Sequence, residues 1–188
     1  MNMRTLVTML LGIAAAAAAG CSLAPLLGGA GHGGPEADQA FLESAAHEGL
    51  AEVRLGELAV DKTSDARVKT LARAVRDDFE QTNAELHALA AAKGIALPAG
   101  LDGQEQRDYR DLARLCCSDF NRYYVNMMAE YHVRDVRRFR SELRHTADPE
   151  LRRFAAANLR LLKDHREQAQ TLMPYFGLGR TYGGDVAQ

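Results

Sequence analysis

The amino-acid sequence predicts an all-α domain: an up-and-down bundle of four long helices, with a short extra helix between the second and third long helices. Three observations lead to this prediction. From residue 38 onward, apolar residues recur three and four positions apart, as on one face of an amphipathic helix. No stretch shows the alternation of apolar and polar residues that is typical of a strand. The links between the helical stretches are short, which favours antiparallel packing of consecutive helices.

The first 20 residues have the pattern of a secretory signal peptide. Arg4 supplies a positive charge, and an uncharged, largely apolar stretch runs from Thr5 to Ala19. This stretch is shorter than the roughly 20 apolar residues that cross a bilayer. Small residues then precede Cys21, as in the bacterial lipobox, where cleavage occurs before a cysteine that carries a diacylglyceryl group. We therefore expect a lipoprotein acylated at Cys21, with palmitate as a typical acyl chain, and cleavage without acylation is the alternative.

The predicted lipid anchor determines the expected location and partners. Two or more acyl chains hold a protein stably on a membrane. Ser22, rather than an aspartate, follows the cysteine, and by similarity to lipoprotein sorting rules this predicts the outer membrane of the cell envelope, facing the periplasm. The formal net charge is −2, and nothing indicates a nucleic-acid partner. The arginines between residues 134 and 144 are interpreted as a solvated helix face, while their contact with anionic lipid is left open. An envelope protein partner, not assigned to any residues, is left open as well.

The chain after the signal peptide divides into three parts. Residues 21–37 are rich in glycine and include prolines, which predicts a flexible tether. Residues 38–173 form the predicted helical bundle domain, which is long enough for one hydrophobic core. Residues 174–188 begin with a proline and contain several glycines, so we expect a mobile C-terminal tail.

The first two long helices are delimited by capping residues. The first is predicted over about residues 38–60 and ends at the polar residues that follow. Ser64 is a good N-cap for the second helix, which is expected to continue to Lys93. Gly94 suits the left-handed C-terminal cap of that helix.

The later helices have similar signals. A short helix is predicted over about residues 103–115, before the apolar pattern loses its phase at two adjacent cysteines. Ser118 is expected to cap the third long helix, about residues 119–145. Asp148 followed by proline is a strong start signal for the fourth, which extends to about Leu172.

Several stretches of the chain, found in every long helix, resemble one known family. They are residues 41–46 and 51–59, residues 83–86, residues 120–125 with His132, and residues 147–151 with 161–165. In these residues the chain is similar to the bacterial family called domain of unknown function 4142. The resemblance implies a ferritin-like four-helix bundle in exported proteins without an established activity. It also shows two departures, because Phe79 stands where members typically place a histidine and Arg160 where they often have a proline.

A di-iron centre of the ferritin type is disfavoured. Ferritin-like proteins that handle dioxygen hold two metal ions with carboxylates from four helices and a Glu-x-x-His pair on each of two helices. This chain has one such pair, Glu142 with His145, beside a helix end. A second pair is absent from the sequence.

Glu52, His132 and His165 are candidate ligands for a single divalent transition metal, and no other cofactor is indicated. The two histidines lie on the inward stripes of the third and fourth long helices, and Glu52 lies on that of the first. An imidazole that faces a core must find a hydrogen-bond partner or bind a metal ion. Asp78 is expected nearby on the second helix. The alternative is that both histidines are core residues, satisfied by Glu52, Tyr131 or a backbone carbonyl.

Cys116 and Cys117 are a candidate redox site. Their Cα atoms lie about 3.8 Å apart across a trans peptide, so an internal disulfide would be strained. If Cys21 is acylated, they are the remaining thiols in an oxidising compartment. They could instead form an intermolecular disulfide, or be two small buried residues at a helix junction.

We therefore expect a lipid-anchored, ferritin-like envelope protein of unknown activity. It is predicted to bind a metal weakly or to serve in a stress-related interaction, without catalytic turnover. The alternative is an enzyme or redox protein, using either an oxidase centre built from Glu52, His132 and His165 or the thiols of Cys116 and Cys117. No glycine-rich phosphate loop and no nucleophile elbow indicates nucleotide or hydrolase chemistry.

Overall fold

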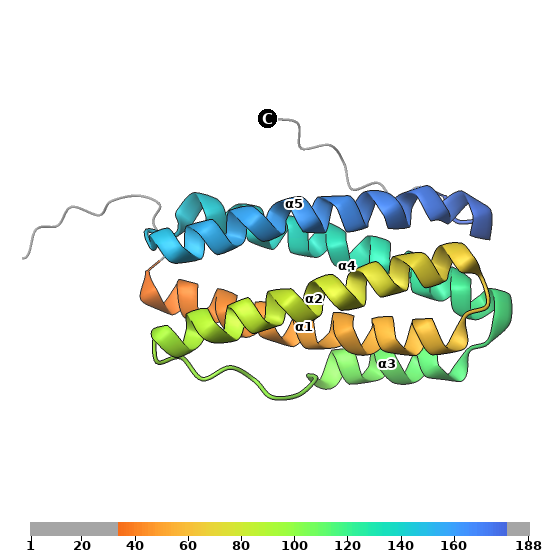
Figure 1. Ribbon diagram of the computed structural model, residues 1–188, viewed down its shortest axis with the longest axis horizontal. Coiled ribbons are helices and arrows are strands. Elements are labelled where there is room, and N and C mark those ends of the chain that lie inside the picture. Colours follow the sequence, from red (N-terminus) through yellow and green to blue (C-terminus); the bar gives the residue numbers. More distant parts are fainter. Residues whose placement is uncertain (1–33, 180–188) are drawn as a thin grey trace, which may run out of the picture. The chain divides into compact units, whose positions relative to one another are not determined.

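The computed structural model describes residues 34–179, and all of its regular structure is helical (Figure 1). The elements are α1 (Pro35–Lys62), α2 (Ala66–Ala92), α3 (Gly103–Arg114), α4 (Cys117–His145), α5 (Pro149–Leu172) and a 3-10 helix, η1 (Met173–Phe176). The prediction of an all-α four-helix bundle with a short extra helix is confirmed. The predicted signal peptide, the lipidation site Cys21 and most of the predicted tether lie outside the described residues.

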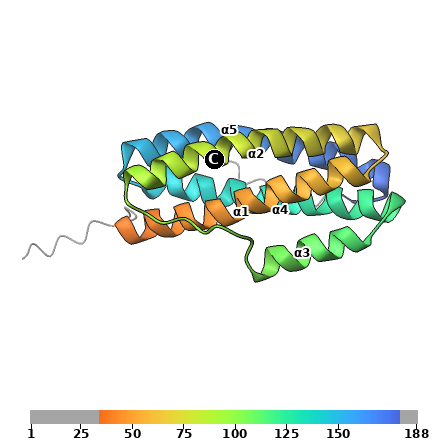
Figure 2. The ribbon, with the colours of Figure 1, turned by 60° about the horizontal axis from the view of Figure 1, so that its bottom comes forward.

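The long helices form two antiparallel pairs. Helix α1 packs along α2, and α4 packs along α5, while α2 also contacts α5 and α1 contacts α4 less extensively. Helix α3 lies beside α1 and returns the chain along the bundle, so that α4 begins at the same end as α2 (Figures 1 and 2). None of the described helices is long and apolar enough to cross a membrane.

Local capping explains most helix boundaries. Asp148 caps α5 by accepting hydrogen bonds from two backbone N–H groups, with a proline in the first turn, as predicted. Asp102 forms a capping box with Glu105 at the start of α3. The cap of α2 is Asp65, one residue after the predicted Ser64, and its carboxylate accepts from two backbone N–H groups. The prediction for α4 was also wrong, because its N-cap is Cys116 rather than Ser118 and no side chain caps it.

The core lies between the four long helices. It contains edge-on aromatic contacts, such as Phe41 of α1 against Phe139 of α4, whose ring centroids are 4.9 Å apart. Met173 of η1 is fully buried, and Leu178 beyond it packs against the core. The packed chain thus extends past residue 174, where the mobile tail is expected to begin, and residues 180–188 lie outside the described range.

Candidate functional site

Glu52, His132 and His165 meet in the bundle core from three different helices. Nε2 of His132, on α4, lies 3.8 Å from Oε1 of Glu52, on α1. The ring of His165, on α5, stands edge-on to that of His132, with centroids 5.2 Å apart. All three residues are at most 1% exposed. The structure therefore brings the three predicted ligand residues into one layer of the core.

Helical periodicity explains why these polar side chains face inward. His132 lies four residues after Met128 and four before Val136, and both of these residues are buried. His165 lies three residues after Leu162 and four before Ala169, which are buried as well. Both histidines thus lie on the helix faces that carry core residues one turn before and one turn after them.

A backbone carbonyl determines the tautomer of His132. Its Nδ1 lies 2.7 Å from the carbonyl oxygen of Met128, one turn earlier on α4. Because a carbonyl oxygen can only accept a hydrogen bond, we assign the proton to Nδ1. The lone pair of Nε2 is then free, and Nε2 has no hydrogen-bond partner among residues 34–179. The unpartnered lone pair of His132 therefore lies on Nε2, the nitrogen nearer to Glu52.

Asp78 has the same effect on His165. Its Oδ2, on α2, lies 2.8 Å from Nε2 of His165, and the carboxylate accepts a hydrogen bond from that nitrogen. The other ring nitrogen, Nδ1, is buried and has no hydrogen-bond partner in the described part of the chain. A histidine whose outer nitrogen donates to a carbonyl or a carboxylate is the usual arrangement of a metal ligand. Both histidines show it here.

Burial keeps the site uncharged near neutral pH. It raises the pKa of Glu52 from 4.5 to about 8, with the negative charge of Glu48 as the next cause. Burial also lowers the pKa of His132 from 6.5 to about 3, assisted by the nearby His165. At neutral pH the site therefore contains a protonated carboxyl group and a neutral imidazole. Both oxygens of Glu52 lack hydrogen-bond partners among the described residues.

Phe79 of α2 closes the fourth side of the site. Its ring centroid is 6.1 Å from those of both His132 and His165. This is the position at which the resemblance to family 4142 leads one to expect a histidine. The phenyl ring fills that place without offering a ligand atom.

Asp135 and Glu48 are two further buried acids, which the sequence analysis did not single out. Asp135 follows His132 by three residues, and Glu48 precedes Glu52 by four, so each shares an inward face with a predicted ligand. Burial, followed by the negative charges of Glu48 and Glu52, holds the pKa of Asp135 well above its ordinary value. Their spacing of three or four residues from a predicted ligand, which places them on the same helix face, was the signal that could have identified Asp135 and Glu48.

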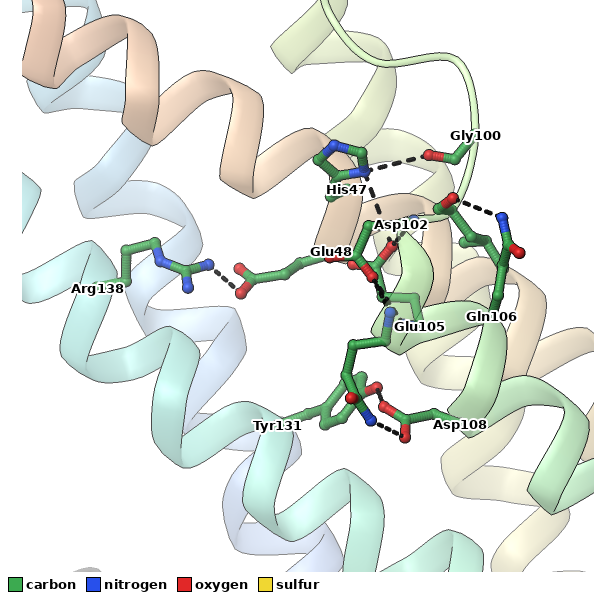
Figure 3. A network of polar contacts seen from close by, with 11 residues as sticks. His47, Glu48, Gly100, Asp102, Glu105, Gln106, Asp108, Tyr131 and Arg138 are labelled. Atoms are coloured by element: carbon green, nitrogen blue, oxygen red, sulfur yellow. Dashed lines mark hydrogen bonds and ion pairs between the residues drawn. The ribbon is translucent and has the colours of Figure 1, made fainter.

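Two arginines of α4 approach these acids. Arg138 forms an ion pair with Glu48 (Figure 3), and Nε of Arg134 lies 3.6 Å from Oε1 of the same residue. The segment interpreted as a solvated arginine face therefore also contributes charge to the edge of the buried cluster. The contacts with Glu48 involve Arg134 and Arg138 and not the other arginines of this segment.

Helix α3 covers this polar side of the bundle (Figure 3). The hydroxyl of Tyr131, on α4, donates a hydrogen bond to the carboxylate of Asp108, on α3. His47 of α1 contacts the carbonyl oxygen of Gly100 at 3.1 Å and lies 3.8 Å from Glu105. The hydroxyl of Tyr131 thus bonds to α3. Of the partners that the alternative named for the histidines, a backbone carbonyl, that of Met128, is the one that bonds to His132.

The remaining candidates lie outside the core site. Glu142 is buried beside Asp38, and the ring of His145 is exposed and contacts the Ser141 carbonyl, so this Glu-x-x-His pair does not converge. Cys116 and Cys117 are both exposed thiols at the start of α4, which overturns the alternative of two buried residues at a helix junction.

The three proposed ligand residues lie near one another, but their ligand atoms do not converge on one position for a metal ion. Between residues 34 and 179, no group of three or more histidine, cysteine, aspartate or glutamate side chains is already arranged to hold a metal ion. Oε1 of Glu52 and Nε2 of His132 lie 3.8 Å apart. Binding would require rotation of at least one of the three side chains.

Comparison with known proteins agrees with the fold. A family model described as a domain of unknown function (DUF4142) matches residues 28–172. A solved DUF305 protein from Streptomyces coelicolor, proposed to be secreted, superposes with a TM-score of 0.66 at 16% identity, covering 79% of this chain and 97% of that one. A DUF305 fragment from Deinococcus radiodurans gives 0.63 at 15% identity, with coverages of 78% and 98%. No curated protein matches the chain. Identities this low show similarity of fold only.

Proposed function

The chain belongs to the DUF4142 family, whose function is unknown, and from this premise we propose that it is a lipid-anchored envelope protein that binds a divalent transition-metal ion weakly. The proposed ligands are Glu52, His132 and His165, and the proposed anchor is acylated Cys21. The bundle is expected to bind the ion without catalysing a reaction.

One observation carries the metal proposal. Ligand atoms of three buried residues lack hydrogen-bond partners among the described residues: both oxygens of Glu52, Nε2 of His132 and Nδ1 of His165. Unsatisfied polar atoms in a core each cost about 1–3 kcal/mol, so a cluster of them calls for a ligand. Imidazole nitrogen combined with one carboxylate suits zinc, iron, copper or nickel better than calcium or magnesium.

The same geometry predicts weak binding. The ion must displace the proton of Glu52, whose pKa is about 8, before the carboxylate can coordinate. It must also rotate side chains that do not yet form a ligand set. Phe79 contributes no fourth ligand. Because the three ligand residues are at most 1% exposed, a substrate larger than an ion has no direct access, which argues against turnover.

The metal proposal is tested by titrating the full-length, metal-depleted protein with Co²⁺ and Zn²⁺. Calorimetry measures stoichiometry and affinity, and the visible spectrum of Co²⁺ reports nitrogen and oxygen coordination. We expect one ion per chain, and loss of that binding in Glu52→Gln and in His132→Gln with His165→Gln. His87→Gln, which changes an exposed histidine of α2, is the matched control. Binding that is absent in the wild type, or equal in all variants, would refute the proposal.

The anchor proposal has a separate test. Cells that express the full-length protein are labelled with a palmitate analogue and fractionated. We expect label in the wild type and its recovery in outer-membrane fractions, whereas Cys21→Ser should be unlabelled and leave those fractions. A labelled Cys21→Ser variant, or an unlabelled wild type, would show that Cys21 is not the acylation site.

A further inference from the structure

Cys116 and Cys117 form an exposed pair of thiols at the junction between α3 and α4. Cys116 is the N-cap of α4, and Cys117 is its first residue. Both are free and exposed to solvent. The pair lies outside the core cluster of Glu52, His132 and His165, so the chemistry of these thiols is independent of the proposed function.

The backbone turns the two thiols toward each other. Cys117 has a φ of 57°, the only positive value at a non-glycine residue in the described range. That left-handed conformation is uncommon for a side chain other than those of glycine, asparagine and aspartate. In this conformation the two Sγ atoms lie 3.2 Å apart, and Cys117 donates a weak hydrogen bond to Cys116.

An internal disulfide is a poor outcome for this pair. Cα atoms of adjacent residues are about 3.8 Å apart, below the range of about 4.4–6.8 Å seen in disulfides. A bond between the sulfurs would have to shorten their separation from 3.2 Å to about 2.0 Å. A larger atom that bridges the sulfurs does not impose that contraction.

We propose that Cys116 and Cys117 form a bidentate site for a trivalent arsenical. Trivalent arsenic is pyramidal and holds its ligands on one side, which matches two neighbouring thiols whose sulfur atoms lie 3.2 Å apart. An ion such as Cu⁺, which prefers two thiolates on opposite sides, does not match them. With arsenous acid, two As–S bonds form, two As–O bonds break, and each released hydroxyl takes one thiol proton and leaves as water. Nothing is oxidised or reduced.

The protonation of Cys117 agrees with this class of ligand. The hydrogen bond to Cys116, followed by its charge, raises the pKa of Cys117 above 9.0. At neutral pH the thiol of Cys117 therefore keeps its proton, which leaves with an arsenic-bound hydroxyl as water. Binding of Zn²⁺ would instead require both thiols to ionise first.

Phenylarsine oxide is the probe for the test, with the full-length protein extracted from membranes in detergent. Its single oxygen leaves as water with both thiol protons. Intact mass should show one phenylarsine group per chain, and the adduct should survive an excess of 2-mercaptoethanol but be released by dimercaptopropanol. Cys116→Ser and Cys117→Ser should each lose the resistant adduct. Both variants retain Cys21, so any contribution from that residue would remain visible in them.

A matched variant tests whether binding depends on the adjacency of the two thiols or only on their number. Cys117→Ser with Ser118→Cys keeps two thiols at the start of α4 but separates them by one residue. We expect it to need at least about tenfold more probe for the resistant adduct, which is about 1.4 kcal/mol. Far-ultraviolet circular dichroism checks that the helices are intact. A resistant adduct in either single variant, an adduct that monothiol removes from the wild type, or isolation of the pair as a disulfide would overturn the proposal.

Discussion

Nε2 of His132 lies 3.8 Å from Oε1 of Glu52 in a core where neither side chain is exposed. The two groups are close enough to share an ion and too far apart for a hydrogen bond to each other. Because the other nitrogen of His132 bonds to the Met128 carbonyl, its free lone pair is directed by the backbone of α4. Four predictions test this arrangement and the helix packing around it.

Replacing Glu52 by glutamine should change how stability depends on pH. In the folded protein the pKa of Glu52 is raised from 4.5 to about 8, so the folded state keeps a proton that the unfolded state releases. The stability from the neutral carboxyl group is thus complete below the unfolded pKa and is lost as the pH rises through about 8. Each pH unit in this window costs up to about 1.4 kcal/mol.

The measurement is urea unfolding with a chelator present, at about pH 5 and about pH 8. Glu52→Gln, which has no carboxyl group to ionise, should become more stable relative to wild type at the higher pH. Glu57→Gln changes a more exposed acid of α1 and should show no such change. A pH-independent difference between Glu52→Gln and wild type would contradict the raised pKa.

Phe79→His should strengthen metal binding. The Phe79 ring lies 6.1 Å from both imidazoles, so a histidine there places a third ring nitrogen beside the site. We expect at least about tenfold higher affinity for Zn²⁺ and, without metal, a loss of stability of about 1–3 kcal/mol from the new buried polar group. Calorimetry and thermal unfolding measure the two effects. Phe79→Leu removes the ring without adding a ligand, and it should not gain affinity.

Asp78→Ala should weaken metal binding more than it weakens the fold. Asp78 orients His165 through a 2.8 Å contact, and loss of such a partner typically costs about 10- to 100-fold in metal affinity. Its side chain is 42% exposed, so water can take the place of the carboxylate at His165, and the loss of folding stability should stay below about 1 kcal/mol. The comparison is Asp77→Ala, whose carboxylate pairs with Arg76 on the same helix. Equal Zn²⁺ affinities for the two variants would rule out this role for Asp78.

Gly56→Ala should destabilise the bundle although alanine favours helices. A Cβ at Gly56 would lie 2.9 Å from Cβ of Arg76 and 3.0 Å from the backbone oxygen of Ala72, so α1 and α2 would have to separate. Overpacking of this kind costs about 1–3 kcal/mol. At Gly49, in contrast, the added Cβ would meet only the end of the Asn83 side chain, which can rotate away. Chemical unfolding should therefore show a smaller loss for Gly49→Ala than for Gly56→Ala.

The presence of each helix could be predicted from the amino-acid sequence, because it depends on local periodicity and capping. Asp148 with the following proline begins α5 as expected, since both residues act within one turn. The cap of α2 was misplaced by one residue, because Ser64 and Asp65 are both good caps and only the path of the incoming chain selects Asp65. Cys116 begins α4 with no side-chain cap, so no capping residue could mark that boundary.

The inward orientation of Glu52, His132 and His165 also followed from the amino-acid sequence, because each has apolar residues three or four positions away on its helix, such as Leu55, Met128 and Leu162. Periodicity assigns a residue to a helix face, but it carries no information about the height at which three separate helices are aligned. The packed bundle set the 3.8 Å approach of Glu52 to His132 and the Asp78 contact to His165. It also placed Phe79 against both imidazoles, because side chains on different helices meet only when long-range packing fixes the helix register.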